Sequence, residues 1–233
     1  MDLLVFAPHP DDAEIGLGGS IARHAADGYS VGIIDLTAGE LSSNGTPATR
    51  RVEADAAAQV LGVAVRGNLG WPDGGIANTP PLVRSAVEAI RHHRPQALAI
   101  PHWNDRHPDH VRASDVLTSA AFASGLRRYA ADGEAWRPDW VCYYFINDSV
   151  APSFVVDVSA HYEAKRAALA CYRSQFTPQP DGEAVSTRLT APTFRALIES
   201  RDAQFGALAG VAFAEGVVVR EPVQRATLLK RSS

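Results

Sequence analysis

The first half of the chain alternates short apolar runs with longer segments of helical periodicity. The apolar runs predict strands over residues 3–7, 31–36, 63–69 and 96–100. Each run is followed by a segment of helical spacing, over residues 18–26, 49–61, 82–93 and 111–126. Strands that alternate with helices pair in parallel, because each helix carries the chain back to the same end of the sheet. The pattern therefore predicts an α/β fold of three layers, in which helices flank a mostly parallel sheet on both faces.

The second half mixes the same elements without strict alternation. Strands are predicted over residues 140–146, 153–158 and 211–219, helices over 161–173 and 193–208, and an irregular stretch over 176–188. No repeat, linker or low-complexity block interrupts the 233 residues. We therefore expect a single domain over residues 1–233, whose C-terminal section completes the sheet and covers the functional site.

Two loops at strand ends are rich in acid/base side chains. Pro8-His9-Pro10-Asp11-Asp12 directly follows the first predicted strand, and His107-Pro108-Asp109-His110 follows the strand at 96–100. In an open α/β sheet, ligands bind at the carboxyl ends of the strands, where such loops lie. We therefore expect the two clusters to meet over one metal ion.

The residue types in these clusters suit catalysis with zinc. Catalytic zinc sites use three protein ligands and leave a position for water. His9, one carboxylate of the Asp11/Asp12 pair and one histidine of the His107/His110 pair would supply those ligands. The remaining carboxylate is then placed to take a proton from the water. The remaining histidine is placed to stabilise an oxyanion or to protonate a leaving group.

The same residues allow plainer explanations. Asp11 or Asp12, and likewise Asp109, could simply cap the helix that follows. Capping does not explain why both loops carry histidines and carboxylates at strand ends of one sheet, so we prefer the metal site. His102 and Asp105 lie on the second loop and are expected to orient the ligands.

A dinucleotide site is the rival interpretation of the glycines after the first strand. Gly16, Gly18 and Asp35 partly match the pattern G-x-G-x-x-G with a later acidic residue. However, Ile21 occupies the third glycine position, and the charged loop separates the strand from Gly16. We therefore expect Gly18 and Gly19 to allow close packing of the first helix on the sheet.

Composition argues against several other classes of protein. The net charge is −4, and no basic run indicates binding to nucleic acid or to an anionic membrane. No apolar run approaches the roughly 18 residues of a membrane span, and the start lacks the features of a signal peptide. The two cysteines, Cys142 and Cys171, lack C-x-x-C spacing and are expected to be isolated thiols. These features predict a cytoplasmic protein that binds neither nucleic acid nor membranes.

At the two loops the sequence resembles the PIG-L / LmbE-like family of zinc-dependent N-acetylglucosaminyl deacetylases. The resemblance joins residues 7–14 to residues 107–110 on a Rossmann-like α/β chain and covers essentially the whole sequence. Within that family, the chain looks most like the branch that serves bacillithiol biosynthesis. The similar stretches are residues 14–19, 36–41, 68–74 and 171–176.

The resemblance implies roles for individual residues. Three of them match the family's zinc ligands: His9, Asp12 and His110. Asp11 matches the general base. His107 matches the histidine that stabilises the oxyanion or protonates the leaving amine, and Asp109 matches the carboxylate that orients this histidine.

Four further residues are expected to bind the substrate. Arg50 and Asp73 match positions that hold sugar hydroxyls, and Gln175 is a weaker match near the site. Arg106, beside the second cluster, is a candidate because of its place at the end of a strand.

The resemblance implies a hydrolase that removes the acetyl group from an N-acetylglucosamine conjugate, with one zinc ion and Asp11 as general base. The bacillithiol branch indicates N-acetylglucosaminyl-malate as the substrate. Relatives often form homo-oligomers, including hexamers, so a homo-oligomer is expected here. Two alternatives stay open: a deacetylase of another N-acyl sugar, such as a chitin oligosaccharide or an antibiotic intermediate, and a non-catalytic sugar- or metal-binding module.

Overall fold

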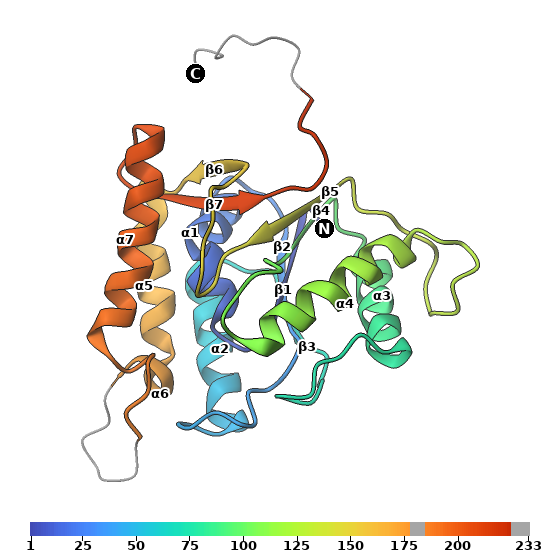
Figure 1. The fold of residues 1–233 in the computed structure, drawn as a ribbon, viewed down its shortest axis with the longest axis horizontal. Coiled ribbons are helices and arrows are strands. Elements are labelled where there is room, and N and C mark those ends of the chain that lie inside the picture. The colour runs from blue at the N-terminus through green and yellow to red at the C-terminus, as the bar shows by residue number, and fades with distance from the viewer. Residues whose placement is uncertain (178–184, 225–233) are drawn as a thin grey trace.

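Seven strands form one sheet in the computed structural model, which describes residues 1–177 and 185–224 (Figure 1). The strands are β1 (Leu3–Ala7), β2 (Val31–Asp35), β3 (Val65–Asn68), β4 (Ala97–Pro101), β5 (Trp140–Tyr144), β6 (Phe154–Asp157) and β7 (Ala214–Val218). Their order across the sheet is β3-β2-β1-β4-β5-β7-β6. Strands β1 to β5 pair in parallel, whereas β7 is antiparallel to both β5 and β6. The predicted α/β fold with a mostly parallel sheet is therefore confirmed.

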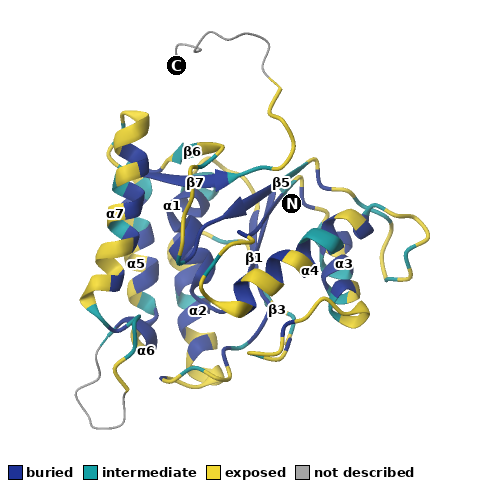
Figure 2. Ribbon diagram, in the orientation of Figure 1, coloured by how far each residue is buried: buried dark blue, intermediate teal, exposed yellow. Residues whose placement is uncertain are grey.

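Helices cover both faces of this sheet (Figure 1). They are α1 (Asp12–Ala26), α2 (Pro47–Leu61), α3 (Pro80–His93), α4 (Pro108–Ser124), the short 3₁₀ helix η1 (Ser159–His161), α5 (Tyr162–Cys171), α6 (Arg173–Phe176) and α7 (Pro192–Ala209). Side chains of β1 alternate between the two faces, as the pleat of a strand requires. Leu3 and Val5 join the core under α1, α2 and α5, and Leu4 and Phe6 join the core under α3 and α4. Figure 2 shows the resulting buried centre and the more exposed edge strand β6.

The order of the strands reverses between β1 and β4. The chain goes from β1 outward to β2 and β3, then returns to the other side of β1, where β4 pairs with it over Leu3–Val5 and Ala97–Ala99. A reversal of this kind leaves a crevice at the carboxyl ends of the two central strands. The loops that follow β1 and β4 carry the two acid/base clusters, so the fold itself brings the clusters together.

Helix α1 begins at Asp12, earlier than the sequence pattern predicts, so the first cluster leads directly into it. The helix bends at Leu17, where φ is −136° and ψ is 15°. Such a bend interrupts the helical hydrogen bonds and frees backbone N–H groups in the next turn. The N–H groups of Gly19 and Ser20 donate instead to the carboxylate of Glu215, at 2.9 and 2.7 Å.

The glycines of α1 pack differently from our expectation. A Cβ on Gly18 would lie 2.9 Å from Cγ of Lys165 in α5. A Cβ on Gly19 would lie 2.7 Å from Cβ of Val158, the residue that follows β6. These two glycines therefore face other parts of the second half of the chain, and the predicted contact with the sheet is wrong for them. Gly16 makes that contact, because a Cβ there would lie 2.7 Å from the carbonyl oxygen of Phe145, just after β5.

Several smaller expectations can be compared with the described residues. Cys142 is buried, Cys171 is half-buried, and both are free thiols as expected. Within the described ranges, no helix combines the length and apolar content needed to cross a bilayer. Part of the predicted irregular stretch, residues 178–184, lies outside those ranges. The single domain over residues 1–233 stays a prediction.

A buried cluster of charges ties α5, α7 and β7 to α1. The ammonium group of Lys165 donates to Asp202 at 2.6 Å and to Glu215 at 2.7 Å. Arg201 pairs with Asp202 and also donates to the carbonyl of Ile15, at 2.8 Å. Each charge has an opposite partner, which buried ions require. Removing Lys165 would leave Glu215 without a cationic partner among the described residues, away from water.

Lys165→Met is therefore expected to lower the free energy of unfolding by about 3–5 kcal/mol, the typical cost of breaking a buried ion pair from one side. Arg166→Met is the matched control, because Arg166 is the next residue and its side chain is 41% exposed. Its surface ion pairs should contribute about 1 kcal/mol or less. Urea denaturation of both variants measures the difference, and equal losses would contradict a structural role for the buried cluster.

Candidate active site

A cavity of about 530 Å³ lies at the carboxyl ends of β1 and β4. Five acid/base residues of the two clusters line it: His9, Asp11, Asp12, His107 and His110. The four residues expected to bind substrate line it as well: Arg50, Asp73, Arg106 and Gln175. Asp109 is the exception, because it is buried and is not part of the lining. The cavity falls within the roughly 300–1,000 Å³ of small-molecule sites.

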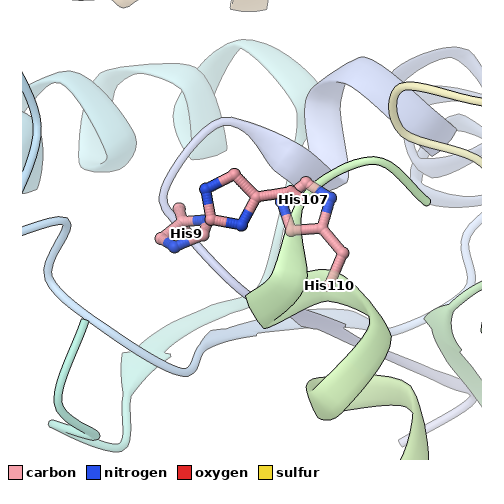
Figure 3. A group of neighbouring side chains, drawn as sticks. All are labelled: His9, His107 and His110. Carbon is pink, nitrogen blue, oxygen red and sulfur yellow. The ribbon is translucent and has the colours of Figure 1, made fainter. Parts of the chain in front are cut away.

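Nitrogen and oxygen donors converge at one end of this cavity. Oδ2 of Asp12 lies 3.1 Å from Nδ1 of His9 and 3.2 Å from Nε2 of His110. One nitrogen from each of His9, His107 and His110 also lies within 4.8 Å of the others. Figure 3 shows the three rings together, His9 from the loop after β1 and the other two from the start of α4. The first set combines two imidazoles with a carboxylate and the second consists of three imidazoles, and zinc binds both kinds of donor. The residues present therefore fit a zinc ion.

Two carboxylates hold the far side of the His9 ring. Its Nε2 lies 3.1 Å from Oδ1 of Asp73 and 3.6 Å from Oδ2 of Asp109. The hydrogen bond with His9 lowers the pKa of Asp73 to about 2. Backbone N–H groups fix both acids, since Leu41 donates to Asp73 at 2.8 Å and Gly74 donates to Asp109 at 2.7 Å. Carboxylates of this kind orient a histidine ligand and fix its tautomer.

The structure shows contacts of these two acids that the resemblance does not imply. The carboxylate of Asp73 is engaged by a ring nitrogen and a backbone N–H while it also lines the cavity, and its expected contact with a sugar hydroxyl stays a prediction. Asp109 was expected to orient His107, but its carboxylate faces His9. The link between Asp109 and His107 runs through the backbone instead, because the N–H of Asp109 donates to Nδ1 of His107 at 3.2 Å.

That hydrogen bond has a chemical consequence for His107. Its side chain caps α4, a role that plain capping had assigned to Asp109. Burial lowers the pKa of His107, and the neighbouring His110 and His9 lower it further. A neutral imidazole that accepts through Nδ1 carries its proton on Nε2. His107 is thus left with one ring donor and lies at the wall of the cavity.

His110 is held by the loop that precedes it. Its Nδ1 lies 3.1 Å from Oδ1 of Asp105. The carboxylate of Asp105 also accepts two backbone hydrogen bonds: Oδ1 accepts from the N–H of His107 at 2.8 Å, and Oδ2 accepts from the N–H of Asn147 at 2.9 Å. The expectation that Asp105 orients a ligand histidine agrees with this contact. It is wrong for His102, whose Nδ1 instead accepts the N–H of Asn104.

Asn147 is a site residue that the sequence reasoning missed. It lies three residues after the end of β5, and its side-chain amide donates to Asp105 at 3.0 Å. Asn147 also lines the cavity. The same rule that indicated the first two loops could have found it, because β5 is parallel to β4 and ends at the same edge.

The adjacent acids Asp11 and Asp12 occupy opposite electrostatic environments. Burial raises the pKa of Asp11 to about 7, although the positive charge of Arg50 opposes the rise. Burial would also raise the pKa of Asp12, but the charge and hydrogen bond of His110 outweigh it and lower the pKa below its usual range. Two acids whose pKa values are pushed apart commonly divide the acid/base work of a site.

Comparison with known proteins identifies the family. The model of the PIG-L family, described as GlcNAc-PI de-N-acetylase, matches residues 4–121 of the 233-residue chain. The chain belongs to the PIG-L family. The matched segment contains both clusters and the two central strands that present them.

Individual members of the family agree with this placement. The 1D-myo-inositol 2-acetamido-2-deoxy-α-D-glucopyranoside deacetylase of Actinosynnema mirum is 32% identical, with 77% of this chain and 82% of that protein aligned. The diacetylchitobiose deacetylase of Thermococcus kodakarensis is 29% identical, with 92% and 81% aligned. A conserved protein from Thermus thermophilus, known from a crystal structure, is 40% identical in sequence. Its structure superposes on 99% of this chain over 100% of its own length, with a TM-score of 0.90. The predicted family and fold are thereby confirmed.

The contact between Asp105 and His110 leads to a testable expectation. Asp105→Asn should lower the affinity for zinc about 10–100-fold, the usual effect of removing a carboxylate behind a ligand histidine. Competition with a chelating indicator measures the affinity. Asp115→Asn is the matched control, since Asp115 lies on the same helix as His110 but is exposed. Its carboxylate accepts a hydrogen bond from the side chain of Asn78 at 2.9 Å. If both variants bind zinc like the unaltered protein, His110 is not a ligand held by Asp105.

Proposed function

We propose that this chain is a zinc-dependent hydrolase that removes the acetyl group from an N-acetylglucosamine conjugate. The proposal rests on one observation: Asp11 and His107 line the same cavity as the donors His9, Asp12 and His110. A site that only binds a sugar or a metal needs neither additional acid/base group. The names of the relatives from A. mirum and T. kodakarensis, both deacetylases of acetylated amino sugars, support the same chemistry.

The geometry suggests how the chain would act on an acetamide. A zinc ion held by His9, Asp12 and His110 would supply a water of lowered pKa and polarise the acetyl carbonyl. Asp11 takes the proton of the attacking water. The Nε2–H of His107 donates to the carbonyl oxygen as negative charge develops on it. One of these two groups then returns a proton to the leaving amine, and acetate is the second product.

Asp11→Asn is expected to lower kcat about 10²–10⁴-fold, the range associated with loss of a general base. Bound zinc should stay near that of the unaltered enzyme, because Asp11 is not among the proposed ligands. His110→Ala should lose zinc and activity together. Amine release and metal content, measured on the same preparations, separate the two variants. Turnover near that of the unaltered enzyme in Asp11→Asn would remove Asp11 from the role of base.

We further propose N-acetylglucosaminyl-malate as the substrate. Arg106 and Arg188 line the cavity, and neither pairs with a carboxylate among the described residues. Positive charge without a partner favours an anionic group on the ligand. This supports the malate conjugate over the neutral sugars that the names of the two relatives indicate.

A homo-oligomer, including a hexamer, stays a prediction.

The substrate is tested with three conjugates: N-acetylglucosaminyl-malate, N-acetylglucosaminyl-inositol and diacetylchitobiose. The malate conjugate should have the highest kcat/KM, by about tenfold or more if its charge contributes about 1.4 kcal/mol. Added salt should reduce this advantage, because exposed charges are screened. Chelation should abolish all three activities, and zinc should restore them. A preference for either neutral sugar would support the alternative of another N-acyl sugar, and inactivity on all three would count against the deacetylase itself.

A further inference from the structure

The two terminal nitrogens of the Arg50 guanidinium are engaged inside the protein at the wall of the cavity. The residue is 3% exposed, although it lies in the first turn of α2. Its guanidinium donates to Oγ of Ser42 at 2.5 Å, to Oδ2 of Asp11 at 3.1 Å and to the carbonyl of Pro10. Two of these three acceptors belong to the loop that contains the proposed base. The resemblance had assigned Arg50 to a sugar hydroxyl.

The backbone of Asp11 is strained. Its φ is 116° and its ψ is −24°, a conformation that residues with a Cβ rarely adopt. Such strain costs about 1–3 kcal/mol and persists only where the surroundings hold the residue in place. Arg50 contacts this residue on two sides, through the peptide that precedes it and through its carboxylate.

The carboxylate of Asp11 also depends on Arg50 for its direction. It is 3% exposed, and among the described residues Arg50 provides its one side-chain hydrogen bond. Asp11 caps α1 by position but makes no side-chain bond to the helix. A buried carboxylate that lost this partner would bear the cost of an unpaired charge and would be free to rotate.

Gly39 provides the space that Arg50 occupies. It lies in the loop between β2 and α2, with φ +70°, and a Cβ at this position would collide with the guanidinium. Two loops therefore meet at Arg50: the loop between β2 and α2, through Gly39 and Ser42, and the loop that carries Asp11.

We infer that Arg50 is a positioning residue for Asp11, and that its main role is to hold the base in place. The inference rests on the proposed function of Asp11 as general base. The planar fork of arginine can bond a carbonyl and a carboxylate at once, which a lysine ammonium cannot do with the same geometry. Loss of this contact should misdirect proton transfer, and displacements of about 1 Å near a reacting centre can cost about 100-fold in rate.

Arg50→Met tests the inference, since methionine keeps much of the apolar stem and removes every donor. We expect kcat to fall about 10–100-fold while KM changes less than about threefold, because orientation of the base affects the chemical step. Zinc content should stay near that of the unaltered enzyme, whereas the melting temperature should fall, because the buried carboxylate of Asp11 loses its partner. Arg51→Met is the matched control, because Arg51 is the next residue, its side chain is 59% exposed, and it pairs with Asp55 on the surface.

Two further variants distinguish positioning from general damage to the fold. Arg50→Ala should regain kcat when millimolar guanidinium is added, and potassium at the same ionic strength should have no such effect. Gly39→Ala should lower kcat by displacing Arg50, and adding it to Arg50→Met should cost little more, because both changes act on one contact.

The outcomes separate this inference from the proposed function. A rise in KM with unchanged kcat in Arg50→Met would show that Arg50 binds the sugar and would overturn the inference alone. Unchanged kinetics, or no rescue by guanidinium, would also overturn it while the deacetylase stands. An unaltered enzyme that releases no amine from any of the three conjugates would overturn the proposed function and the inference with it.

Discussion

The parallel pairing of β1 with β4 is the contact on which the site depends. The two strands are separated by about ninety residues of chain, yet they lie side by side at the centre of the sheet. Leu4, Val5 and Phe6 are completely buried, so apolar packing on both faces stabilises this pairing. Helices α1 and α4 then start at the same edge, and each carries an aspartate in its first turn, Asp12 and Asp109. The positive ends of the two helix dipoles favour these carboxylates.

Charges buried at this edge are arranged in pairs. Asp12 lies between His9 and His110, and Arg50 contacts Asp11. Further carboxylates stand behind the two histidines: Asp73 and Asp109 behind His9, and Asp105 behind His110. Each of these outer acids accepts a hydrogen bond from the backbone of a different loop. The donors therefore converge in a fixed geometry before any ligand arrives, which reduces the reorganisation needed during a reaction.

The sequence was sufficient for the features that repeat along the chain or cluster in short motifs. Buried parallel strands are continuous apolar runs, and His9 through Asp12 and His107 through His110 lie at strand ends whose adjacency follows from the topology. What the sequence did not reveal are contacts between residues far apart in the chain. Lys165 meets Glu215 across 50 positions, and no local pattern marks that pair. The same holds for Asp73 against His9, 64 positions away.

Helix α1 connects these distant contacts to the strain at Asp11. Gly16 lies against the backbone after β5, and the N–H groups of Gly19 and Ser20 are held by Glu215, which Lys165 holds in turn. A helix fixed in this way along its first three turns cannot shift to relax the residue that precedes it. The positive φ of Asp11 is therefore maintained from two directions, by α1 on one side and by Arg50 on the other. The buried cluster in the second half of the chain is thus linked to Asp11 through α1, although none of its charged side chains lines the cavity.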